Sequence, residues 1–183
     1  MTADDKLAIP DTGESEPDAE LSSWLETARN FIDHGRFGEA EEIYRWLIGF
    51  GVQHEKVLTN LAAICQLRGD FDESLALLNQ ALSLKPESLE ANLNLANVLE
   101  AQGDYKSAVS QIQQILTLDA NYAEAHHNHG FLLHRLKNHV GAIDSYRKAL
   151  ELKPFYPDAY YNLGNALKAT GDFDGALAAY EQS

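Results

Sequence analysis

Small residues recur with a spacing of 34 residues along most of this chain, and this repetition constrains the fold more than any other feature. One series contains Gly164, Gly130, Ala96, Ala62 and Ala28. A second series contains Ala176, Ala142, Ala108, Ser74 and Ala40. A period of this length is typical of tandem units that bury their apolar faces against one another. The sequence therefore predicts an array of stacked units with a core that runs as a stripe.

Each repeat carries two apolar stripes at helical spacing, separated by a turn signal. In the first repeat the stripes are Trp24, Ala28 and Phe31, then Ala40, Tyr44 and Leu47. Later repeats place a glycine and then an aspartate between the stripes, as in Gly69 with Asp70 and Gly171 with Asp172. Glycine readily takes the left-handed conformation that ends a helix, and aspartate caps the start of the next helix. Each repeat is therefore predicted to be a helix-turn-helix.

Together these features resemble the tetratricopeptide repeat (TPR) family over residues 21–183. The residues that carry the resemblance are Trp24, Leu61, Leu95, Leu163, Gly130, Gly164, Ala40, Ala108, Ala142, Ala176, Tyr44, Tyr146, Tyr180, Pro86 and Pro154. The resemblance implies an all-α fold, a right-handed α-solenoid of helix-turn-helix units.

The repeat period divides the chain into consecutive units that begin at equivalent positions. We expect the units to span 21–54, 55–88, 89–122 and 123–156, with an incomplete fifth unit at 157–183. Residues 1–20 are rich in Asp and Glu and have little to bury, which predicts a flexible acidic leader. An alternative is that this leader lies as an autoinhibitory strand in the groove of its own chain.

Two places in the array depart from the repeat pattern. In the fourth unit Lys137 replaces the turn glycine and His139 replaces an aromatic residue, so we expect the softest junction there. In the fifth unit Leu177 and Tyr180 have no following helix to cover them, whereas solenoids require a polar closing helix. We therefore expect that the chain is a fragment, or that another chain covers this end, for instance by self-association.

An asparagine recurs two residues before the small residue of each later unit, at Asn60, Asn94, Asn128 and Asn162. Asparagine is a mediocre helix former, so something other than helix propensity selects it. The column resembles the asparagine ladder in the superhelix of protein O-linked N-acetylglucosamine transferases and related proteins, which implies a peptide-binding role. A side-chain amide offers an acceptor and two donors to a passing backbone. The alternative is that these amides form hydrogen bonds to neighbouring helices and only hold the stacked helices together.

Residues adjacent to this column are expected to line the same concave groove. Asn97 and Asn165 follow Asn94 and Asn162 by three positions, which places them one helical turn further along. Phe131 takes the corresponding position in the fourth unit, and His127 and Tyr161 directly precede the column. This mixed lining suits an extended polypeptide better than a small metabolite.

Charge and composition argue against several other classes of function. The net charge of −14 argues against nucleic acid, because binding a phosphate backbone requires clustered Lys and Arg. No apolar run approaches the length of a membrane span, and the N-terminus lacks a signal-peptide pattern. The single cysteine cannot form an internal disulfide. We therefore expect a cytoplasmic protein that does not bind membranes.

Two groups of residues invite a chemical interpretation that we do not favour. His126 and His129 have the spacing of metal ligands, but they occupy a packing column, and we expect hydrogen-bonded histidines and no metal site. Cys65 also stands in a packing column and has no paired base, so it is expected to be a core residue.

The sequence thus predicts a scaffold that binds extended segments of other proteins, with no catalysis and no cofactor in this chain. The alternative is that the chain is the substrate-recruiting arm of a larger enzyme, such as a protein glycosyltransferase.

Overall fold

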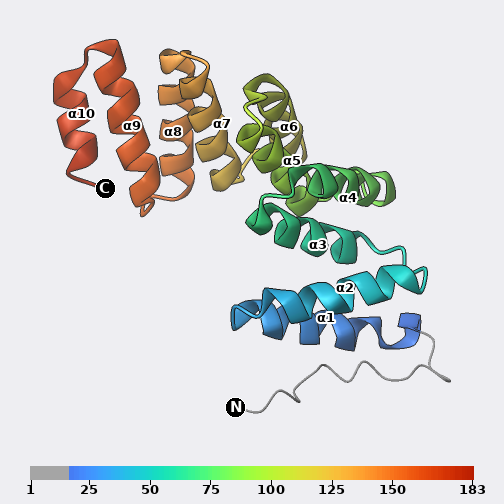
Figure 1. Ribbon diagram of the computed structural model, residues 1–183. Coiled ribbons are helices and arrows are strands. Elements are labelled where there is room, and N and C mark those ends of the chain that lie inside the picture. Colours follow the sequence, from blue (N-terminus) through green and yellow to red (C-terminus); the bar gives the residue numbers. More distant parts are fainter. Residues whose placement is uncertain (1–16) are drawn as a thin grey trace. The chain divides into compact units, whose positions relative to one another are not determined.

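The structure is a computed structural model, shown in Figure 1, and it describes residues 17–183. These residues form ten helices and no strand. The helices are α1 (Pro17–Asp33), α2 (Phe37–Gly49), α3 (Glu55–Arg68), α4 (Phe71–Leu84), α5 (Leu89–Ala101), α6 (Tyr105–Leu118), α7 (Ala123–Arg135), α8 (His139–Leu152), α9 (Pro157–Thr170) and α10 (Phe173–Tyr180). The predicted all-α solenoid fold of helix-turn-helix units is confirmed.

The described residues divide into two compact units, one ending at Pro86 and the other beginning at Glu87. In the first unit, α1 packs against α2, α2 against α3, and α3 against α4. In the second unit, α5 to α10 pack in the same sequential manner, and α7 also contacts α9. Alternate helices α5, α7 and α9 are therefore the first helices of three consecutive pairs.

The first helix begins at Pro17, four residues before the start that we expected for the repeats. Proline suits the first position of a helix because its missing N–H would have no partner there. The expected flexible leader otherwise lies in residues 1–16, which are outside the described residues. Among residues 17–183, no helix combines the length and apolar character needed to cross a membrane.

Two of the recurring small residues, Gly130 and Gly164, lie where an aromatic side chain of the partner helix approaches closely. A Cβ added at Gly130 would lie 2.8 Å from ring atoms of Tyr146, and one added at Gly164 would lie 2.5 Å from the ring of Tyr180. Tyr146 is fully buried in the core formed by α7 to α10. These two glycines thus let α7 approach α8 closely and let α9 approach α10 closely.

The turns between paired helices use the predicted chemistry. Gly69, Gly103 and Gly171 have φ values of 80°, 81° and 87°, in the left-handed region. Lys137 occupies the same position in the fourth pair with φ 65°, a conformation that disfavours a residue with a Cβ. The following side chains, Asp70, Asp104, Asn138 and Asp172, each accept a hydrogen bond from a backbone N–H in the first turn of the next helix.

Candidate functional site

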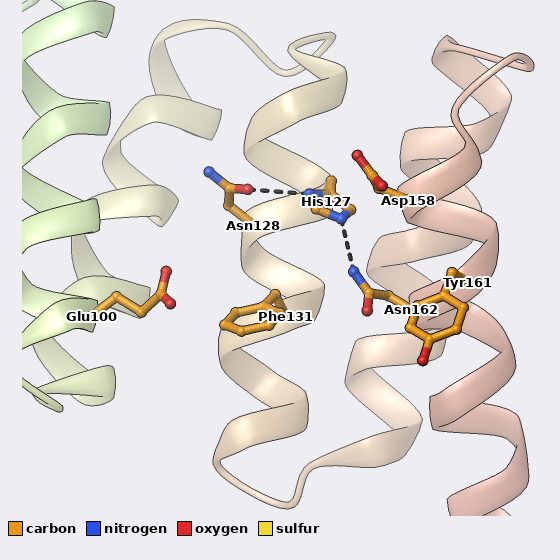
Figure 2. Close-up of a pocket in the computed structure, with 7 residues that line it drawn as sticks. All are labelled: Glu100, His127, Asn128, Phe131, Asp158, Tyr161 and Asn162. Carbon is orange, nitrogen blue, oxygen red and sulfur yellow. Dashed lines mark hydrogen bonds between the residues drawn. The ribbon is translucent and has the colours of Figure 1, made fainter. Parts of the chain in front are cut away.

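The second unit contains a pocket of about 400 Å³ whose lining comes from three first helices, α5, α7 and α9 (Figure 2). The lining residues are Glu100, His127, Asn128, Phe131, Asp158, Tyr161 and Asn162. Five of these seven were candidate groove residues in the sequence, namely His127, Asn128, Phe131, Tyr161 and Asn162. These five side chains come from two successive repeats, in which equivalent positions are 34 residues apart, and the structure brings them into one site.

His127 holds two of the asparagines in place (Figure 2). Its Nδ1 lies 3.2 Å from Oδ1 of Asn128, and its Nε2 lies 3.1 Å from Nδ2 of Asn162. A neutral ring with its proton on Nδ1 satisfies both contacts, because Nδ1–H donates to Asn128 and Nε2 accepts from Asn162. The ring also packs against Tyr146 and Tyr156, with centroids 5.8 and 4.9 Å away. His127 thus connects α7 to α9.

The surroundings of His127 favour its neutral form. Burial is the main cause that lowers its pKa, and the nearby ammonium group of Lys153 acts in the same direction. The hydrogen bond to Asn128 and the carboxylates of Asp158 and Glu124 act in the opposite direction without reversing the shift. The ring is therefore uncharged near neutral pH and keeps the two amides in a fixed orientation.

Each of these two amides keeps one polar end available. No residue in the described part of the chain bonds to Nδ2 of Asn128 or to Oδ1 of Asn162. Within the described residues, Nε2 of His129 is the only buried side-chain nitrogen or oxygen that lacks a hydrogen-bond partner. The unbonded ends of Asn128 and Asn162 are therefore not buried, and they reach solvent. The pocket therefore presents two N–H donors from Asn128 and one acceptor from Asn162.

The other predicted asparagines lie outside this pocket. Nδ2 of Asn60, on α3 of the first unit, donates to the hydroxyl of Tyr44 on α2 at 3.0 Å. Oδ1 of Asn165 accepts from the hydroxyl of Tyr180 on α10 at 2.9 Å. On α5, Asn94 is half-buried and Asn97 is exposed. Part of the asparagine set therefore stitches neighbouring helices, as the alternative interpretation proposed.

Two acidic residues of the pocket, Glu100 and Asp158, were missed in the sequence. Glu100 follows Asn97 by three positions on α5, and Asp158 precedes Tyr161 by three positions on α9. Extending the helical face by one turn at each end would have found both residues. Glu100 is half-buried, and this burial raises the pKa of its carboxyl although Arg135 opposes the shift.

The histidines outside the pocket are engaged in hydrogen bonds. Nε2 of His126 lies 2.9 Å from the carbonyl oxygen of Ala120, and Nδ1 of His129 lies 2.9 Å from Oγ of Ser145. Within residues 17–183, no group of three or more His, Cys, Asp or Glu side chains could hold a metal ion. Cys65 is fully buried in the first unit, and burial raises the pKa of its thiol to about 11.

Comparison with known families matches this architecture. A tetratricopeptide repeat model matches residues 67–128, and a TPR repeat model matches residues 138–171. The two matches together cover slightly more than half of the chain. The chain belongs to the tetratricopeptide repeat family. No curated protein matches the sequence.

Solved TPR structures share this fold at low sequence identity. A crystal structure of MamA is 22% identical, with a TM-score of 0.76, and the match covers 85% of this chain and 91% of that one. MamA from Desulfovibrio magneticus RS-1 is 16% identical with a TM-score of 0.79, covering 89% and 92%. YrrB, described as a TPR protein with an unusual peptide-binding site, is 18% identical with a TM-score of 0.71, covering 92% and 90%. These likenesses show the fold alone.

Proposed function

We propose that this TPR protein is a non-catalytic scaffold that binds an extended polypeptide segment in the pocket lined by α5, α7 and α9. Tetratricopeptide repeats are protein-interaction modules, and YrrB is a relative in fold that has a peptide-binding site. The family supports a role in protein interaction. The proposal adds the place of binding and the groups that hold the guest.

The available amide ends of Asn128 and Asn162 carry this proposal. A peptide backbone exposes one carbonyl acceptor and one N–H donor per residue, which complements the donors of Asn128 and the acceptor of Asn162. Packed helices lie about 10 Å apart, a span of about three residues of extended chain at roughly 3.3 Å each. Equivalent positions on consecutive repeats can therefore contact the same strand in register.

His127 makes the arrangement selective for backbone groups. Because it binds the Oδ1 of one amide and the Nδ2 of the other, the two asparagines present opposite hydrogen-bonding ends to the guest. The amides are also oriented before the guest arrives, which reduces the entropy lost on binding. Such a site binds the main chain of the guest, and any preference for particular sequences must come from neighbouring side chains of the pocket.

The test uses peptides selected on the full chain from a displayed library of random peptides about ten residues long, enough to span the repeats of the pocket. Replacing both Asn128 and Asn162 with alanine should weaken binding about thirtyfold, because the two lost hydrogen bonds contribute roughly 1 kcal/mol each. Asn165→Ala is the matched control, since Asn165 lies on α9 but does not line the pocket. Unchanged affinity in a double variant of native helicity would refute the proposal.

We also propose that the chain self-associates through its last helix. Phe173 and Leu177 on α10 are 68% and 61% exposed, and they form an apolar surface that a second copy could cover. Light scattering over a range of concentrations would test it. The alternative that the chain recruits substrates for a larger enzyme would be favoured by a gene that continues into a catalytic domain.

A further inference from the structure

We propose that the bound segment places an arginine or lysine side chain in this pocket, where its cationic group pairs with Glu100 and Asp158. This inference rests on the proposed function and adds the chemical class of the guest. The pocket lining contains two carboxylates and no lysine or arginine. Its amides can hold any backbone, so the carboxylates supply the preference among side chains.

Glu100 is the stronger part of the argument, because its carboxylate is half-buried and unpaired. No described residue forms a hydrogen bond or ion pair with it. Arg135 is close enough to influence it, but its guanidinium lies over the ring of Tyr105, 5.0 Å from the centroid, and bonds to the hydroxyl of that tyrosine. A partly desolvated carboxylate without a partner is unfavourable. A cation from a guest would supply the missing partner.

Asp158 adds a second unpaired carboxylate from the opposite side of the pocket. It lies in the first turn of α9, and no described residue pairs with it. The nearby ammonium of Lys153 is placed over the ring of Tyr156, 4.4 Å from the centroid. His127, between the two carboxylates in Figure 2, is kept neutral by its burial. The pocket thus carries two carboxylates that form no ion pair with a described lysine or arginine.

The aromatic lining suits the aliphatic part of a basic side chain. Phe131 points from α7 toward Glu100, and Tyr161 lies on α9 beside Asn162 (Figure 2). Long basic side chains lay their methylene groups on apolar surface while the charged group reaches a polar partner. Aromatic faces also attract cations directly. An acidic guest would be repelled, which argues against the acidic segment at residues 1–16 as the occupant.

The first experiment determines the composition of the peptides that the full chain selects from the random library. We expect lysine and arginine to be enriched in the bound pool. The enrichment should disappear for the double variant Glu100→Gln with Asp158→Asn. It should persist for Glu90→Gln, because Glu90 is an exposed residue of α5 that does not line the pocket.

The second experiment measures one charge directly. A selected peptide is synthesised with arginine or with citrulline, which has nearly the same shape but no charge, and both affinities are measured by fluorescence polarisation. The arginine peptide should bind about fivefold more tightly to the natural chain. The two peptides should bind alike to the Glu100→Gln, Asp158→Asn variant. Added salt should reduce the difference, since ions screen partly exposed pairs.

Failure of this inference can be told apart from failure of the proposed function. If peptides bind through Asn128 and Asn162 without enrichment of basic residues, the scaffold stands and the cation site is refuted. Enrichment that survives the double charge variant would also refute it, because the attraction would then come from the overall negative charge. If no peptide binds the natural chain, both proposals fail.

Discussion

Replacing His127 with phenylalanine tests the central feature of the site, which is the orientation of two amides by one ring. The substitution keeps an aromatic ring of similar size against Tyr146 and Tyr156. It removes the hydrogen bonds of 3.2 and 3.1 Å to Asn128 and Asn162. At roughly 1 kcal/mol for each bond, the free energy of unfolding should fall by about 2 kcal/mol. Affinity for a selected peptide should fall as well, because both amides lose their fixed orientation.

Urea denaturation gives the change in stability, and fluorescence polarisation gives the change in affinity at a temperature where the variant is folded. His127→Asn is a useful comparison, because a shorter polar side chain keeps hydrogen-bonding groups but cannot reach both partners from the same position. If His127→Phe lowers stability but leaves affinity unchanged, the ring is only structural and our account of the site is wrong. If both quantities are unchanged, the two hydrogen bonds have no role in solution.

The same variant has a signature in the pH dependence of stability. The pKa values of His127, His129 and His134 are all lowered, mainly by burial. The unfolded chain therefore binds more protons than the folded one below about pH 6.5, the ordinary value for histidine. Stability should be greatest above that pH and should decrease as the pH falls toward the lowered values. His127→Phe should remove one of the three contributions and flatten this decrease.

Two further predictions concern the packing and turns of the repeats. Gly130→Val should lower the free energy of unfolding by about 2 kcal/mol in chemical denaturation, because the valine side chain would overlap the ring of Tyr146. Gly38→Val is the control and should have little effect, since nothing lies within 4 Å of a Cβ at that position. Lys137→Gly should raise the melting temperature, because glycine adopts the left-handed conformation of this turn without the cost of about 1 kcal/mol that a Cβ imposes. An unchanged melting temperature would contradict this explanation of the fourth turn.

Local patterns were sufficient to predict most of the fold. The left-handed turn residues and the capping side chains Asp70, Asp104, Asn138 and Asp172 follow from neighbouring residues in the sequence. The spacing of the small residues also predicted the length of the repeat. These features depend on contacts within one helix or one hairpin, so they can be read from short segments.

The candidate site was predictable as a helical face but not as a set of bonds. Residues such as Asn128 and Phe131 share a face because they are three positions apart, and this holds for any helix. Glu100 and Asp158 were missed because they lie one turn beyond the predicted face. The pocket also requires helices that are two elements apart in the chain to lie close together, and helical periodicity says nothing about that distance.

The amino-acid sequence by itself determined the repeat length, the helix-turn-helix units and the face that carries the asparagines, because periodicity and turn chemistry act over short range. Only the tertiary structure decided which end of each amide is used. Asn128 bonds to His127 through its oxygen, while Asn162, 34 residues later, bonds to the same ring through its nitrogen. Two identical residues in equivalent positions thus present opposite groups, because one ring stands between them.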